Sequence, residues 1–123
     1  MNKESVLVTG GCGFIGSNLS KSLLGLGFKV TIVDNLSSSR KDYKKFLSEN
    51  PEIDFVNDCM SSDSILSRIR NKEFDTVFHV AAIPRVVYSV ENPYETTDVN
   101  VSRTVKLLES CCENVRRFIF SSS

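Results

Sequence analysis

The stretch Ser5-Val6-Leu7-Val8-Thr9-Gly10-Gly11-Cys12-Gly13-Phe14-Ile15-Gly16 decides the fold of this chain. Residues 5–9 form a short β-branched run, which predicts a buried strand. From Phe14 onward, apolar residues recur at helical spacing and stop before Gly27, a residue type that commonly ends helices. The sequence therefore predicts a strand, a glycine-rich turn and a helix in direct succession.

Three glycines in this turn, at positions 10, 13 and 16, have different expected roles. Gly10 allows the chain to turn sharply off the strand, and Gly13 allows backbone amides to approach a pyrophosphate. Gly16 allows the helix to pack closely. Free amides and the helix dipole at the start of the helix favour phosphate charges. The motif predicts a dinucleotide-binding turn, and a glycine-rich turn that serves only packing is the alternative.

An acidic residue follows the second predicted strand, residues 29–33, at the spacing expected after such a turn. The carboxylate of Asp34 can accept hydrogen bonds from both ribose hydroxyls of adenosine, and it would repel a 2′-phosphate. The predicted cofactor is therefore NAD rather than NADP. The basic residues Arg40 and Lys41 weaken this preference, and a turn or cap role for Asp34 is the alternative. Asn35 and the serines at 37–39 could line the same ribose.

The rest of the chain continues the alternation of strands and helices. Further strands are predicted at residues 53–57, 75–80 and 116–120, and further helices at 42–49, 62–70 and 94–113. The last helix is predicted to bury Val101, Val105 and Leu108, and residues 81–93 are read as a long connection. The predicted fold is one α/β domain over residues 1–123, with a doubly wound parallel sheet in strand order 3-2-1-4-5.

Composition narrows the functional classes. The 123 residues are 41% hydrophobic and 24% charged, with fifteen basic and fifteen acidic residues, so neither nucleic acid nor a membrane surface is an expected partner. No stretch approaches the ~20 apolar residues of a membrane span. Four cysteines without a CxxC pair, and a single histidine, His79, predict no metal site. Cys111 and Cys112 are interpreted as partly buried small residues, and His79 as locally bonded. Free thiols and a polar start favour the cytoplasm.

Several segments together resemble a known family. They are residues 9–16, 34–37, 79–82, 89–93, 100–101 and 118–123. The chain is similar to the extended short-chain dehydrogenase/reductases with a Rossmann fold, the NAD-dependent epimerases and dehydratases, and most closely to their UDP-glucose 4-epimerase branch. The resemblance covers only the N-terminal part of that family, so the last strands and a C-terminal substrate domain are absent from this chain.

The resemblance implies roles for individual residues. Gly10, Gly13, Phe14, Ile15 and Gly16 would hold the pyrophosphate, and Asp34 and Asn35 the adenosine ribose. Asp58 would meet the adenine amino group, with the backbone of Cys59 beside it. Ala81, Ala82 and Ile83 would line the nicotinamide-side ribose, and Asn100 would brace that loop. Ser123 would be the catalytic serine, although Ser121–Ser123 as a polar tail is the alternative.

Three departures from the family pattern stand out. The family usually has a glycine between Asn100 and Thr104, where this chain has Ser102 and Arg103. Asn57 replaces a residue that is often small. Family catalysis also needs a tyrosine followed four residues later by a lysine, which lowers the pKa of the phenol, and this chain contains no Tyr-x-x-x-Lys.

The resemblance implies a full-length enzyme that oxidises a nucleotide sugar transiently at its 4-hydroxyl, with NAD as hydride carrier. The 123-residue chain alone is expected to be inactive. The alternatives are a non-catalytic NAD-binding module, part of a nucleotide-sugar dehydratase or decarboxylase, or a structural remnant. An open edge on the fifth strand favours self-association, hence a homo-oligomer.

Overall fold

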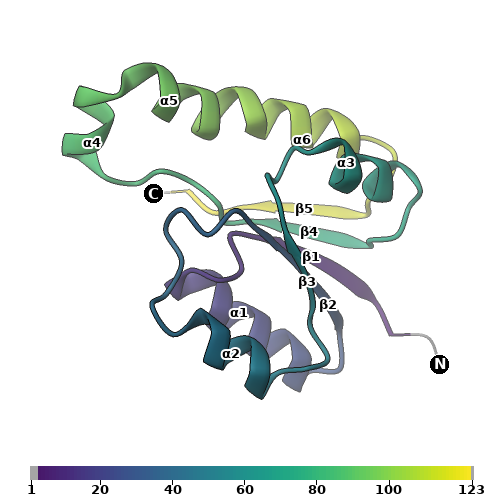
Figure 1. The fold of residues 1–123 in the computed structure, drawn as a ribbon. Helices are drawn as coiled ribbons and strands as arrows, with labels where there is room; N and C mark the ends of the chain where they lie inside the picture. The colour runs from purple at the N-terminus through teal and green to yellow at the C-terminus, as the bar shows by residue number, and fades with distance from the viewer. Residues whose placement is uncertain (1–2, 123) are drawn as a thin grey trace.

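The computed structural model describes residues 3–122, in which strands and helices alternate (Figure 1). The strands are β1 Ser5–Thr9, β2 Lys29–Asp34, β3 Asp54–Asn57, β4 Thr76–His79 and β5 Arg117–Phe120. The helices are α1 Phe14–Gly25, α2 Tyr43–Glu49, α3 Asp63–Arg70, α4 Val86–Glu91, α5 Pro93–Thr97 and α6 Arg103–Cys111, with a π-helical segment, η1 Asp98–Ser102, between α5 and α6.

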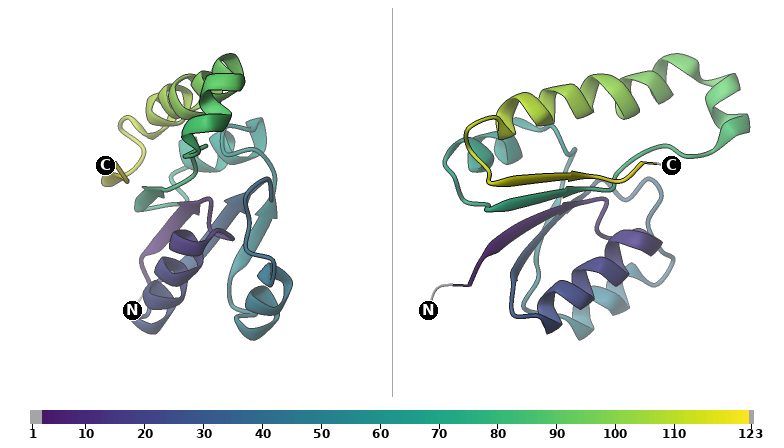
Figure 2. Two further views of the ribbon diagram at one scale, coloured as in Figure 1. Left: turned by 90° about the vertical axis from the view of Figure 1, so that its left-hand side faces the viewer. Right: turned by 180° about the vertical axis from the view of Figure 1, so that it is seen from behind.

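The five strands form one parallel sheet in the order β3-β2-β1-β4-β5, which confirms the predicted topology. β1 lies at the centre, where Val6 pairs with Val30 of β2 on one side and with Thr76 of β4 on the other. Helices α1 and α2 cover one face of the sheet, and α3 and α6 cover the other (Figures 1 and 2). The fold is therefore the doubly wound α/β architecture expected from the sequence.

Each face of the sheet has its own apolar core, because successive side chains of β1 point to opposite faces. Val6 and Val8 pack with Leu23 of α1 and Phe46 of α2. On the other face, Leu7 belongs to the core that the buried residues of α3 and α6 complete, namely Ile65, Leu66, Ile69, Leu107 and Cys111. The apolar face of α3 is thus buried, and β1 is covered on both sides.

The predicted helix over residues 94–113 differs from the structure in two respects. A π-helical turn, Asp98–Ser102, interrupts it. The prediction that this helix buries Val101, Val105 and Leu108 is also wrong, since these residues are 55%, 57% and 44% exposed. The buried row is instead Thr104, Leu107, Ser110 and Cys111.

Side-chain size and hydrogen bonding explain the choice of row. Both rows follow helical spacing, and periodicity favours the more hydrophobic one. The buried row is made mostly of small residues, which let α6 approach α3 and the sheet. The hydroxyl of Thr104 is also bonded to a ring nitrogen of buried His79, at 2.8 Å, so its polar atom is satisfied. The hydrogen bond to His79 cannot be read from the helix sequence alone.

Two smaller expectations also need correction. The connection over residues 81–93 contains helix α4, which buries none of its residues and so lacks the amphipathic pattern by which helices are recognised. Cys112, expected to be partly buried, is exposed, whereas Cys111 is buried. The reason is that Cys112 follows the last turn of α6 on the side away from the core.

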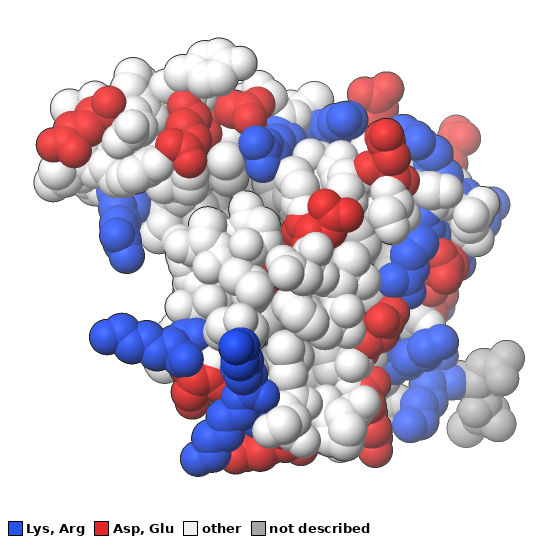
Figure 3. Space-filling model, in the orientation of Figure 1, with Lys and Arg blue, Asp and Glu red and all other residues white. Residues whose placement is uncertain are grey.

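The surface carries no extended field of one sign on the face that Figure 3 shows, where acidic and basic side chains are interspersed. This distribution agrees with the equal numbers of acidic and basic residues in the sequence. Among the helices formed by residues 3–122, none has the length and apolar character needed to cross a bilayer.

Candidate nucleotide-binding site

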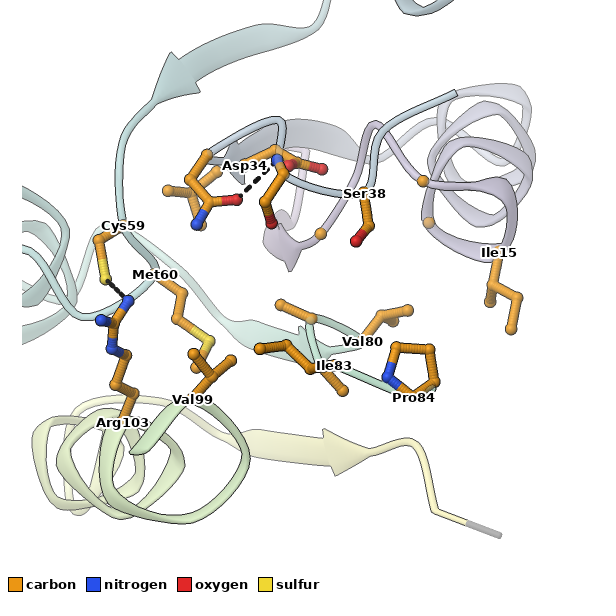
Figure 4. Close-up of a pocket in the computed structure, with 18 of the residues that line it drawn as sticks. Ile15, Asp34, Ser38, Cys59, Met60, Val80, Ile83, Pro84, Val99 and Arg103 are labelled. Carbon is orange, nitrogen blue, oxygen red and sulfur yellow. Dashed lines mark hydrogen bonds between the residues drawn. The ribbon is translucent and has the colours of Figure 1, made fainter. Parts of the chain in front are cut away.

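A cleft with a volume of about 420 Å³ opens at the carboxyl ends of β1, β2 and β4. After β1 the chain runs to α1 on one face of the sheet, and after β4 it runs to the helices on the other face. Ligands of open α/β sheets bind in the crevice created by such a reversal. Figure 4 shows side chains from several elements converging on this cleft, including Asp34, Met60, Ile83 and Arg103.

Eleven of the predicted cofactor residues line the cleft: Gly10, Gly13, Phe14, Ile15, Gly16, Asp34, Asn35, Cys59, Ala81, Ala82 and Ile83. Ser37 and Ser38, which the sequence placed near the ribose, line it as well. Phe14 and Ile15 are 76% and 60% exposed, so they flank the opening rather than join the core face of α1. The structure thus brings residues from four separate chain segments into one crevice.

Gly10 makes the turn from β1 into the cleft possible. Its φ is +69°, a left-handed conformation that favours glycine. Its amide donates to the carbonyl of Val33 at 2.9 Å, which ties the turn to β2. A Cβ at this position would lie 2.9 Å from the Cα of Ala81, so the absence of a side chain also lets the β1 and β4 loops approach each other.

Gly13 and Gly16 differ in what surrounds them. Gly13 lines the cleft, and a Cβ on it would have the carbonyl oxygen of Gly10 at 3.3 Å and that of Ser38 at 3.9 Å as its nearest neighbours. A Cβ on Gly16 would lie 2.2 Å from the same oxygen and 2.8 Å from the Cα of Gly11. Gly16 is therefore required for packing of α1 against the turn itself, whereas Gly13 keeps space free at the start of the helix.

The amino end of α1 fits a diphosphate. Its first amides have no intrahelical acceptor, and no side chain among the described residues caps it. Gly13, at the N-cap position, adds no Cβ between these amides and the cleft. Backbone donors and the positive end of the helix dipole therefore face the cavity, as in a general anion site.

Gly11 is a structural residue that the sequence reasoning did not single out. A Cβ on Gly11 would lie 2.4 Å from Cγ2 of Ile32, a fully buried residue of β2. The residue type alone could have suggested a close contact, but its partner lies on another strand and is known only from the fold.

Asp34 ends β2 with its carboxylate at the cleft, and it also organises the surrounding backbone. One oxygen accepts from the amide of Cys12 at 2.9 Å, and the other accepts from the amide of Leu36 at 2.7 Å. Asp34 therefore also has the turn-stabilising role that the sequence left open as an alternative. Since a carboxylate has about four acceptor positions, it retains capacity for a ligand hydroxyl.

Arg40 does not supply a free cation to this region. Its guanidinium donates from Nε and Nη2 to the carboxylate of Asp42, at 2.9 and 2.8 Å, and from Nη1 to the hydroxyl of Ser17 at 3.0 Å. Its side chain is not among those that line the cleft in the part of the chain described. Arg40 is therefore poorly placed to bind a 2′-phosphate.

Asn100 holds the loop after β4 from within the π-helical turn. Its Oδ1 accepts from the amide of Ile83 at 2.7 Å, and its Nδ2 donates to the carbonyl of Ile83 at 2.9 Å. The side chain therefore satisfies both backbone groups of one residue that lines the cleft. π-Helical turns occur frequently at functional sites; Val99 of this turn and Arg103, the residue directly after it, line the cleft.

His79 and two threonines fix the start of the same loop. The hydroxyl oxygen of Thr9 accepts from the amides of Val80 and Ala81, at 3.0 and 3.1 Å, so its proton must go to Nδ1 of His79, at 2.8 Å. Nε2 of His79 then carries the ring proton and donates to Thr104. Burial lowers the pKa of His79 to about 4, so the ring is neutral at pH 7. His79 is locally bonded, as expected.

Two predicted site residues lie outside the cleft lining, and a third cannot be placed. Asp58 uses its carboxylate to accept from the amide of Cys59 at 2.7 Å. Asn100 acts through Ile83, as described above. Ser123 falls outside the described residues.

The sequence reasoning did not identify Met60, Val99 and Arg103 as lining residues, although they line the cleft. Arg103 carried one signal in the sequence, because it and Ser102 stand in the segment where the family usually has a glycine.

Comparison with known proteins gives the family. Residues 6–123 match the family model described as the NAD dependent epimerase/dehydratase family. A putative UDP-glucose 4-epimerase of Methanocaldococcus jannaschii is 36% identical over 119 residues, covering 96% of this chain and 37% of that protein.

Solved structures agree with this match. An epimerase from Methanothermobacter thermautotrophicus superposes with a TM-score of 0.87 at 40% identity, covering 99% of this chain and 36% of its own. An enzyme from Bordetella bronchiseptica, solved in complex with NAD+, superposes with a TM-score of 0.85 at 33% identity, covering 98% of this chain and 36% of its own. The chain thus spans little more than a third of the length of each of these three relatives. On its sequence, its topology and the architecture of its cleft, the chain belongs to the NAD dependent epimerase/dehydratase family.

Proposed function

We propose that this chain binds NAD and is the nucleotide-binding part of a nucleotide-sugar 4-epimerase. The observation that carries the proposal is the uncapped amino end of α1, which opens into the cleft while the carboxylate of Asp34 lies at the neighbouring strand end. The first group suits a diphosphate and the second suits a ribose with free hydroxyls. Residues 1–123 would act as one NAD-binding domain.

The preference for NAD over NADP rests on charge. Asp34 would repel a phosphate on the 2′-hydroxyl, and Arg40 is already paired with Asp42. We therefore expect NADP to bind at least ten times more weakly than NAD, which corresponds to about 1.4 kcal/mol.

Calorimetric titration of the chain with NAD and with NADP tests this proposal directly. Asp34→Asn should lower the ratio of the dissociation constant for NADP to that for NAD. Asp63→Asn, which removes an exposed carboxylate on α3 outside the cleft, should leave the ratio unchanged. The absence of measurable NAD binding by the folded chain would refute the proposal.

The chemistry of the complete enzyme is also part of the proposal. NAD, when bound, would supply the acceptor for hydride in a transient oxidation of the sugar 4-hydroxyl. This chain would contribute the groups that bind and orient the cofactor, with Ser123 the proposed contact to the reacting hydroxyl. The tyrosine and lysine of family catalysis are not within it: Leu47, Asn92 and Asp98 stand four residues after its three tyrosines.

We therefore expect the 123-residue chain to bind NAD without converting UDP-glucose to UDP-galactose. A coupled assay with purified chain measures this, and turnover that tracks the chain through a second purification step would overturn the expectation. A dehydratase begins with the same oxidation, and the family description includes both reaction types. Supplying the chain with NAD and several nucleotide sugars would show whether any is bound.

A further inference from the structure

Arg103 occupies the end of the cleft farthest from the proposed phosphate position. It is the first residue of α6, and its side chain is 34% exposed. The guanidinium donates from Nε to the carboxylate of Asp98 at 3.0 Å and from Nη1 to the sulfur of Cys59 at 3.2 Å. Figure 4 shows Arg103 and Cys59 together at one end of the cleft, with Pro84 and Ile15 at the other.

The strand order indicates which part of a dinucleotide would reach this end. The glycine turn follows β1, Asp34 ends β2, and Cys59 follows β3, so the three groups lie in succession along the carboxyl edge of the sheet. If the diphosphate binds at the turn and the ribose at Asp34, the base must extend toward Cys59. This step rests on the function proposed above.

The chemistry of this end suits a flat, uncharged ring. The side chains of Met60 and Val99 supply apolar surface, and Met60 is buried. Because the N–H groups of a guanidinium lie in its plane, the hydrogen bonds of Arg103 to Asp98 and Cys59 use the edge of the group rather than its faces. Guanidinium groups bind aromatic rings through these faces. Because its charge is already paired with Asp98, Arg103 is less suited to a phosphate.

We propose that Arg103 is a binding residue for the adenine base of NAD, with its guanidinium held ready by Asp98 and Cys59. The family usually has a glycine between Asn100 and Thr104, and a glycine in place of Arg103 would leave this end of the cleft without a guanidinium. Arg103 would thus be a feature of this chain that strengthens binding of the adenosine half of the cofactor.

Titration calorimetry with NAD and ADP-ribose tests the proposal on the full chain. Arg103→Ala should raise both dissociation constants roughly 3- to 30-fold. Arg103→Lys should recover less than half of that loss on a logarithmic scale, because the ammonium keeps the charge and not the plane. Lys106→Ala, which removes an exposed charge from the same helix, should change neither constant. Circular dichroism establishes that each variant is folded.

The outcomes separate this inference from the proposed function. If the unsubstituted chain does not bind NAD, the proposed function is refuted. If it binds NAD and Arg103→Ala binds equally well, or if Arg103→Lys restores full affinity, the role of Arg103 is refuted while NAD binding stands.

A second measurement avoids substitution of Arg103. Saturating AMP should protect Cys59 of the unsubstituted chain from alkylation at least five-fold, because the base would cover its sulfur, and it should leave exposed Cys112 unprotected. Unchanged alkylation of Cys59 in AMP would place the base elsewhere and overturn the inference.

Discussion

Substitution of Gly13 and Gly16 by alanine should separate ligand binding from folding at two positions of the same turn. Gly13 has φ −78° and ψ 178°, values that alanine adopts without strain. An added Cβ would have only the carbonyl oxygen of Gly10, at 3.3 Å, as a close neighbour. At Gly16 the added Cβ would lie 2.2 Å from that oxygen, and the backbone would have to move.

The expected magnitudes follow from these contacts. For Gly13→Ala, loss of a favourable N-cap residue costs about 0.5–1 kcal/mol, and the lower entropy of the unfolded chain offsets a similar amount. The free energy of unfolding should therefore stay within ~1 kcal/mol of the original. For Gly16→Ala, overpacking against the backbone costs about 3 kcal/mol and the helix-propensity gain offsets about 1 kcal/mol, so we expect a net loss of ~2 kcal/mol.

Urea unfolding followed by circular dichroism measures stability, and calorimetry measures NAD binding. Gly13→Ala should unfold like the original chain yet bind NAD at least ten-fold more weakly, because the methyl group occupies space at the helix amino end. Gly25→Ala, in the last turn of α1, is the matched control, since its Cβ would meet nothing within 4 Å. It should bind NAD normally and be equally or slightly more stable.

Two results would refute this reasoning. If Gly13→Ala bound NAD within two-fold of the original chain, the helix amino end would not be the phosphate site. If Gly16→Ala were as stable as Gly25→Ala, the close approach of α1 to the turn would not constrain the sequence.

Three further predictions concern stability and the loop after β4. Burial lowers the pKa of His79 to about 4, so as the pH falls the unfolded state binds a proton at this residue before the folded state does. The free energy of unfolding should therefore decrease as the pH falls from 6.5 toward 4, by about 2 kcal/mol between pH 7 and pH 5. Urea unfolding of His79→Gln should show a shallower pH dependence. An identical pH dependence in both proteins would contradict this. Asn100→Ala removes both the acceptor for the Ile83 amide and the donor to the Ile83 carbonyl, so it should lower NAD affinity about ten-fold and increase hydrogen exchange of the Ile83 amide; unchanged exchange would show that the brace is dispensable. Leu107→Ala should destabilise the chain by about 2–5 kcal/mol, because Leu107 is buried, and Val105→Ala by less than ~0.5 kcal/mol, because Val105 is exposed. Equal losses of stability in thermal unfolding would contradict the assignment of Leu107 to the buried row.

The sequence by itself determined the topology and most of the cleft. The β-branched run at 5–9, the glycine turn and the carboxylate of Asp34 are local signals, because a buried parallel strand, a tight turn and a strand end each restrict the residue types they accept. Alternation of strands and helices then leaves few arrangements, since parallel connections are right-handed. Eleven predicted residues consequently lie around one crevice.

Only the tertiary structure decided which row of the last helix faces the core and which side chains close the cleft. The row containing Thr104 is buried because a hydrogen bond from His79, 25 residues earlier in the chain, satisfies its hydroxyl. Arg103 lies at the cleft directly after a π-helical turn, and its guanidinium donates a hydrogen bond to Cys59, 44 residues earlier. Periodicity states which residues can be buried together, whereas the choice between two suitable rows depends on partners from distant segments. Those partners come within reach only when the sheet has formed.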